Sequence, residues 1–178
     1  MASLKSTRDA CIPGSIDKLK LGGIIFDTRD GYSIPKAQLA ESVGVSISTI
    51  DQWEIGGASP LLRKLNLVID LLELDPRETL SAVCCEKATR CVLAALKIEL
   101  PVDAGLPWPK WSKFEWLEFA KTIKQEREAI KASRRLISLA ADLNMGTLTA
   151  IERGLFKAGI ARARKLSWLF MIEVDHAS

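Results

Sequence analysis

The chain has 178 residues, of which 48% are hydrophobic and 26% charged; this is long and apolar enough to bury a core and excludes an intrinsically disordered protein. No apolar run approaches the roughly 20 residues that span a bilayer, and residues 1–15 lack the apolar core of a signal peptide, so we expect a cytoplasmic protein without membrane contact. The net charge of +3 is uneven, because residues 1–80 carry nine Lys or Arg against eleven Asp or Glu (−2), whereas residues 121–178 carry eleven against six (+5). A polyanion would therefore favour the C-terminal part of the chain.

Apolar residues recur at helical spacing along most of the chain, with Gly or Pro between the runs. In chain order, this pattern predicts helices near residues 17–30, 35–43, 47–55, 60–73, 77–98, 113–131, 133–142, 145–153 and 158–172. Residues 99–111 hold three prolines and a glycine, so no helix is expected there and the segment is interpreted as a linker. No segment shows sustained strand alternation, and the predicted fold class is all-α.

Residues that bear catalytic or metal-binding chemistry are scarce. A single histidine, His176, leaves the usual acid–base and nucleophilic arrangements without their partner, and there is no Gly-rich phosphate loop. Cys84, Cys85 and Cys91 are close in sequence, but they form no CxxC pair and have no histidine nearby. We expect small buried thiols on a helix rather than a redox or metal site, and neither enzyme activity nor a cofactor or metal.

Two segments of the chain repeat one another. Residues 21–57 align without a gap with residues 119–155, at an offset of 98. Unlike residue types with separate physical roles coincide in this alignment: Arg29 with Arg127, Ser46 with Asn144, Glu54 with Glu152, and Gly56 with Gly154. Because helix amphipathicity alone does not fix the spacing of an arginine and a glutamate, we interpret the segments as two copies of one unit. The second copy is expected to be one residue longer after its glycine.

The first copy resembles the Cro and phage-repressor class of helix-turn-helix domains. The resemblance is carried by Arg29, LAESVGVSISTI (39–50), Glu54, and PLLRKL (60–65) followed by ELDP (73–76). The second copy looks like a diverged member of the same family. The resemblance implies two five-helix domains in tandem, residues 17–76 and 113–175, joined over residues 77–112 by a helix and a Pro/Trp-rich linker.

The resemblance also implies roles for individual residues. Ion pairs between the first and third helices would be structural: Arg29 with Glu54, and Arg127 with Glu152. The outward face of the third helix would enter the major groove and read bases through Ile47, Ser48, Asp51 and Gln52. Contacts to DNA phosphates would come from Lys36, Ser46, Thr49, Arg63 and Lys64. In the second copy, the face toward nucleic acid or a protein partner would comprise Arg134, Arg135, Met145, Thr147, Arg153, Lys157, Arg162 and Arg164.

These roles predict a sequence-specific, DNA-binding transcriptional regulator of bacterial or phage type. Its partner would be double-stranded DNA, with a regulatory protein or a second copy of the chain as further partners. The alternative is a protein-interaction module, such as an anti-activator, antirepressor or antitoxin, whose domains no longer read DNA. The net negative charge of the first copy, with Asp51 on the face that would approach phosphates, favours this alternative. The sequence leaves both functions open.

Overall fold

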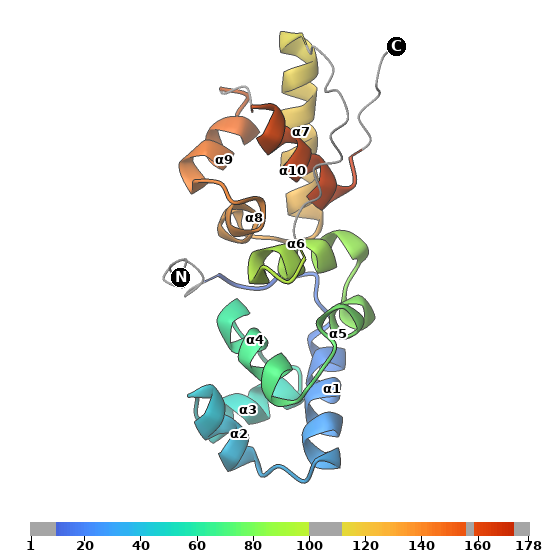
Figure 1. The fold of residues 1–178 in the computed structure, drawn as a ribbon, viewed down its shortest axis with the longest axis vertical. Helices are drawn as coiled ribbons and strands as arrows, with labels where there is room; N and C mark the ends of the chain where they lie inside the picture. The colour runs from blue at the N-terminus through green and yellow to red at the C-terminus, as the bar shows by residue number, and fades with distance from the viewer. Residues whose placement is uncertain (1–9, 100–111, 156–158, 173–178) are drawn as a thin grey trace.

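The computed structural model describes residues 10–99, 112–155 and 159–172, and over these residues the fold is all-α, as predicted (Figure 1). The described residues form α1 (Lys18–Gly31), α2 (Lys36–Val43), α3 (Ile47–Glu54), α4 (Leu62–Leu71), α5 (Pro76–Val83), α6 (Glu86–Leu96), α7 (Lys113–Ala129), α8 (Arg134–Ala141), α9 (Met145–Glu152) and α10 (Ile160–Phe170). None of these helices has both the length and the apolar character needed to cross a membrane. Apart from Glu99, the predicted linker 99–111 lies outside the described residues.

The start and end of α3 follow from local sequence. The hydroxyl of Ser46 accepts a hydrogen bond from the Thr49 amide at 3.2 Å, and this caps the first turn of α3. Gly44 precedes it with φ of 71°, the left-handed conformation that lets α2 stop and the chain turn. Gly56 has the same φ of 71° after α3. Helices α2 and α3 are therefore delimited by residues suited to these turns.

The repeat extends through the backbone of both copies. The pairs α2 and α8, α3 and α9, and α4 and α10 each start 98 residues apart. Backbone positions with positive φ recur at the same offset: Ser33 with Lys131, Gly44 with Asp142, Gly56 with Gly154, and Glu73 with Met171. The expected extra residue in the second copy is wrong, because Leu62 and Ile160, which begin α4 and α10, keep the offset of 98.

The helix predicted over residues 77–98 is broken into α5 and α6. Cys84 and Cys85 have extended backbone at the break, with ψ of 169° and 160°. The expectation of buried thiols on one helix is therefore wrong for two of the three: Cys85 is exposed, Cys84 is half-buried at the end of α5, and Cys91 alone is buried within α6. The break has a physical reason, because α5 packs on α1 whereas α6 turns away to pack on α8.

Helix α6 lies between the two copies and packs against both of them (Figure 1). Lys87 forms an ion pair with Glu126 at 2.7 Å, and the guanidinium of Arg90 stands 5.0 Å from the centre of the Trp168 ring. The hydrophobic core continues from one copy into the other. Within the described residues the second copy contributes four helices, α7 to α10, rather than the five that the resemblance implies.

The close crossing of α1 and α3 gives a test of this packing. A Cβ added at Gly22 would collide with the Trp53 carbonyl oxygen and lie 2.6 Å from that of Glu54, whereas one at Gly23 would meet nothing within 4 Å. We expect Gly22→Ala to lower the free energy of unfolding by about 1–3 kcal/mol through overpacking. Gly23→Ala, in the same helix turn, should raise it by about 0.5–1 kcal/mol. Urea denaturation of both variants measures this; equal effects would contradict the close crossing.

Candidate nucleic-acid interface

A buried arginine–glutamate pair joins the first and third helices of the first copy. Arg29 Nε donates to Glu54 Oε1 at 2.6 Å, and their side chains are only 7% and 4% exposed. Arg29 Nη1 also donates to the carbonyl oxygen of Ile34 at 2.9 Å, just before α2. One guanidinium therefore ties α1, the turn into α2, and α3 together. The charges are buried but paired and hydrogen-bonded, as buried charges must be.

The second copy repeats this arrangement atom for atom. Arg127 Nε donates to Glu152 Oε1 at 2.7 Å, and Arg127 Nη1 donates to the carbonyl oxygen of Ala132 at 3.1 Å. Ala132 is the counterpart of Ile34 at the offset of 98. The structure thus brings together both pairs that the sequence predicts to be structural, and each has the same additional backbone acceptor.

The first residue of the second helix adds another cation to each pair, and here the copies differ. Lys36 Nζ lies 3.0 Å from Glu54 Oε2, and Arg134 Nε lies 2.7 Å from Glu152 Oε2. Lys36 also donates to Asp51 Oδ1 at 2.6 Å, and this hydrogen bond is the largest cause that raises the pKa of Lys36.

The second copy has Thr149 in place of Asp51, and its hydroxyl donates to the Met145 carbonyl oxygen instead. Lys36 is therefore shared by two carboxylates, whereas Arg134 meets one.

The four predicted base-reading residues lie on the outward side of α3. Ile47, Ser48 and Gln52 are exposed and Asp51 is partly exposed, whereas Ile50 and Trp53 on the opposite side are buried. The side-chain oxygen of Gln52 lies over Gly57, beyond the end of α3. The outward face accordingly offers an amide, a hydroxyl, a lysine-paired carboxylate and an apolar side chain.

The residues predicted to contact DNA phosphates differ in whether their side chains already have partners within the protein. Lys64 Nζ donates to the carbonyl oxygens of Val43 and Gly44, at 2.6 and 3.0 Å, and so caps the C-terminal end of α2. The side-chain hydroxyls of Ser46 and Thr49 form a hydrogen bond with each other at the start of α3. Arg63 is exposed and forms no ion pair within the described residues. Lys36 and Lys64 therefore have structural partners that the sequence does not reveal.

The predicted face of the second copy is not uniformly open. Met145 is 51% exposed, the side chain of Arg134 is 43% exposed, Arg153 is exposed, and Thr147 is partly buried. Three of its arginines make further interactions: Arg135, Arg162 and Arg164. Lys157 lies outside the described residues.

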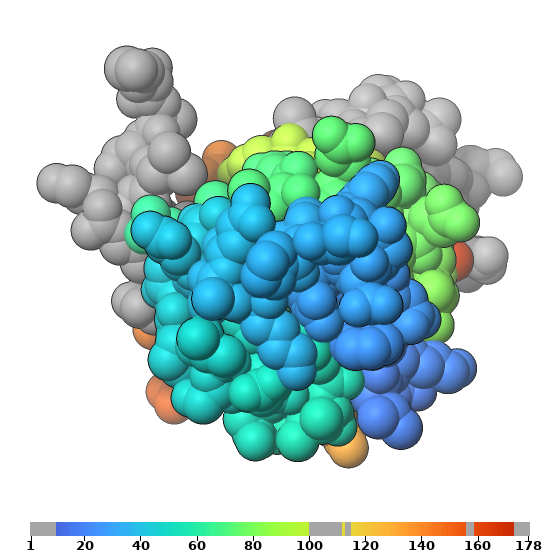
Figure 2. Space-filling model, turned by 90° about the horizontal axis from the view of Figure 1, so that it is seen from below, coloured from blue at the N-terminus to red at the C-terminus, as the bar shows by residue number. Residues whose placement is uncertain are grey.

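The outer face of the second helix differs most between the copies. In α2 it presents Gln38 and Ser42 to solvent, whereas their counterparts in α8, Leu136 and Ala140, are no more than 1% exposed because α6 packs there. Seen from the end of the molecule formed by the first copy, blue and teal residues of that copy occupy the middle of the surface, and residues of the second copy show only at its margin (Figure 2). The first copy therefore keeps its α2–α3 surface open, and the second has half of the equivalent surface covered.

The described residues offer little other chemistry. No group of three His, Cys, Asp or Glu side chains among them is placed to hold a metal ion, and the four cysteines are free thiols. Burial raises the pKa of the Cys91 and Cys84 thiols, so both stay protonated near neutral pH.

Comparison of the chain with protein-family models, with curated proteins and with solved structures found no match. The functional interpretation of α2 and α3 therefore depends on the residues and geometry described above.

The buried pair gives a direct test of the scaffold. We expect Glu54→Gln to destabilise the protein by about 3–5 kcal/mol, because the Arg29 charge would remain buried without a counter-charge. Asp51→Asn, which removes only a partly exposed ion pair, should cost about 0–1 kcal/mol. Urea denaturation of both variants measures the difference. A loss below about 1 kcal/mol for Glu54→Gln would show that the pair does not hold α3 in place.

Proposed function

We propose that the protein is a sequence-specific DNA-binding transcriptional regulator of bacterial or phage type, and that the first copy reads duplex DNA through α3. One observation carries this proposal: the buried Arg29–Glu54 pair holds α3 against α1, and the opposite face of α3 exposes side chains able to contact bases. A helix that reads bases must be held rigidly, because direct readout depends on hydrogen-bond geometry.

Each side chain on this face suits a particular contact. The Gln52 amide can form two hydrogen bonds with the edge of an adenine, once it swings away from Gly57. Ser48 can donate to or accept from several bases, and Ile47 can contact a thymine methyl group. Arg63 is exposed and suits a phosphate. The contact set combines base readout by α3 with backbone positioning by its neighbours.

The difference between the copies supports assigning readout to the first. DNA recognition by a helix-turn-helix needs the second helix close to the backbone and the third in the groove. In the first copy α2 has a polar, uncovered outer face, whereas α8 is covered by α6 and α9 lacks a counterpart of Gln52, having Ala150 instead. Arg134 and Arg153 of the second copy suit phosphate contacts, which add affinity without sequence discrimination.

A second candidate function, a protein-interaction module, is favoured by the engagement of the lysines. Lys36 is held by two carboxylates and Lys64 caps α2, so neither ammonium is unpaired at the surface. Ile47 on α3 and Ile55 directly after it are 50% and 64% exposed, and apolar side chains of this kind suit a protein partner. In that function the first copy would bind a regulatory protein rather than an operator.

Substitution of Gln52 tests base readout. After selection of a preferred duplex by the purified protein, Gln52→Ala should lose about 10–100-fold of its preference for that duplex over a single-base variant, since a bidentate contact discriminates by about 1–3 kcal/mol. Gel-shift titrations against both duplexes measure this. Gln125→Ala, an exposed glutamine on α7, serves as the matched control. An unchanged preference in Gln52→Ala would contradict the role of Gln52.

Substitution of Asp51 tests the charge of the face. Asp51→Thr places the residue of the second copy in the first, and frees Lys36 from one of its two carboxylates. We expect tighter binding to duplexes of any sequence and a plot of log affinity against log salt that is steeper by about 1, because one more phosphate is neutralised. Fluorescence anisotropy from 50 to 200 mM salt measures the slope. Weaker binding would mean that Asp51 itself contacts a base, and an unchanged slope would exclude Lys36 as a phosphate contact.

A further inference from the structure

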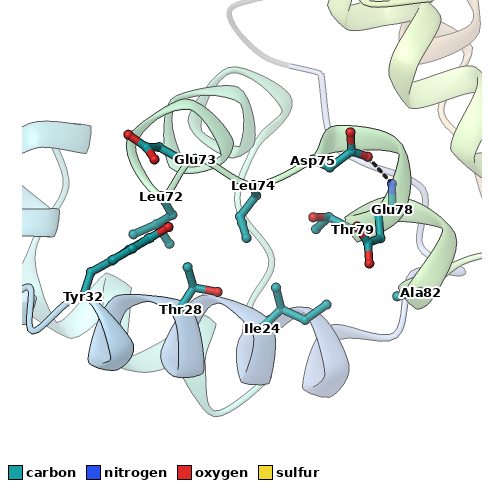
Figure 3. Close-up of a pocket in the computed structure, with 10 residues that line it drawn as sticks. All are labelled: Ile24, Thr28, Tyr32, Leu72, Glu73, Leu74, Asp75, Glu78, Thr79 and Ala82. Carbon is teal, nitrogen blue, oxygen red and sulfur yellow. Dashed lines mark hydrogen bonds between the residues drawn. The ribbon is translucent and has the colours of Figure 1, made fainter.

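A pocket of about 320 Å³ opens in the first copy between α1, the turn that joins α4 to α5, and α5 itself (Figure 3). Its apolar lining comes from Ile24, Leu72 and Leu74. It lies on a different side of α1 from Gly22 and Arg29, the residues that contact α3. The pocket is therefore separate from the face proposed to read DNA.

A nearly buried hydroxyl faces this pocket. Thr79 is only 5% exposed, and its hydroxyl has no hydrogen-bond partner within the described residues. In Figure 3, the Thr28 side chain points from α1 toward the turn that joins α4 to α5, and the Thr79 side chain points from α5 into the same pocket. The Thr79 oxygen is open to the pocket rather than sealed in the core, so a polar group that enters the pocket can form a hydrogen bond with it.

Three carboxylates, Glu73, Asp75 and Glu78, line the same pocket, and none of the lining residues is a lysine or arginine. Asp75 uses one oxygen to cap α5, accepting from the Glu78 amide at 2.6 Å. Glu73 and Glu78 are exposed and form no ion pair among the described residues. The pocket thus combines an apolar floor with uncompensated negative charge, which attracts a cation.

The second copy shows that this chemistry is not part of the shared scaffold. The counterpart of Thr28 is Glu126, whose carboxylate is paired with Lys87 of α6 at 2.7 Å. The counterpart of Glu73 is Met171. The Thr28 hydroxyl and the Glu73 carboxylate are therefore not repeated at the equivalent positions of the second copy.

We propose that this pocket binds a small organic amine, with its protonated nitrogen at the carboxylates and its short carbon chain on the apolar floor. A protonated amine donates up to three hydrogen bonds, which suits acceptors on the Thr28 and Thr79 hydroxyls and the Glu78 carboxylate. Pockets of this size take small molecules rather than folded partners. The inference does not depend on DNA binding and is tested without DNA.

Titration calorimetry of the full chain with 1,4-diaminobutane, and with the neutral 1,4-butanediol as matched ligand, tests the proposal. Saturable binding of the diamine and none of the diol is expected. Glu78→Gln should weaken diamine binding about tenfold, through loss of one charge-assisted contact. Thr79→Val, which keeps the shape but removes the hydroxyl, should weaken it by a smaller factor.

Glu41→Gln is the control, because it removes the same charge from an exposed position on α2 outside the pocket. It should leave the affinity for the diamine unchanged. Equal weakening by Glu41→Gln and Glu78→Gln would overturn the proposal, since it would mean nonspecific attraction to an acidic surface. Equal binding of diamine and diol, or no binding of either, would also overturn it.

Discussion

The buried arginine–glutamate pair is the interaction on which the rest of the structure depends. In each copy it fixes the third helix against the first and anchors the turn before the second helix through one backbone carbonyl. Removing one partner of such a pair leaves an unpaired charge in the core, which is strongly destabilising. The pair therefore keeps the first and third helices in one relative position. The repeated left-handed turns complete a scaffold that both copies share. Function is therefore expected in what differs between the copies.

Helix α6 is the main source of that difference. It covers the outer face of α8 and leaves the equivalent face of α2 open. The break at Cys84 and Cys85 lets α6 leave the direction of α5 and reach the second copy. The described parts of the two copies thus share one continuous hydrophobic core. In the proposed function, the open face of α2 and α3 reads DNA and the second copy adds phosphate contacts.

The sequence predicts much of this scaffold and little of its surface. The spans of α2 and α3 follow from periodicity, because packing and capping leave regular signals in the sequence. The partners of Arg29 and Arg127 follow from the resemblance to helix-turn-helix domains, and the structure pairs them as the resemblance implies. The left-handed turn at Asp142 is not predicted, since residues other than glycine only uncommonly adopt a positive φ. The contact from Lys64 to the end of α2 depends on how α4 docks, and a long flexible side chain has many acceptors within reach. The break at Cys84 is hidden because apolar spacing continues from α5 into α6.

The central claim is that the first copy meets duplex DNA and that the equivalent face of the second does not read it. Nuclear magnetic resonance mapping of the full chain, titrated with duplex DNA at low salt, tests this most directly. The account predicts chemical-shift changes centred on the amides of Ile47, Ser48 and Gln52, with smaller changes near Arg134 and Arg153 and none in the middle of α9. Changes centred on α9, or no changes with any duplex, would contradict it.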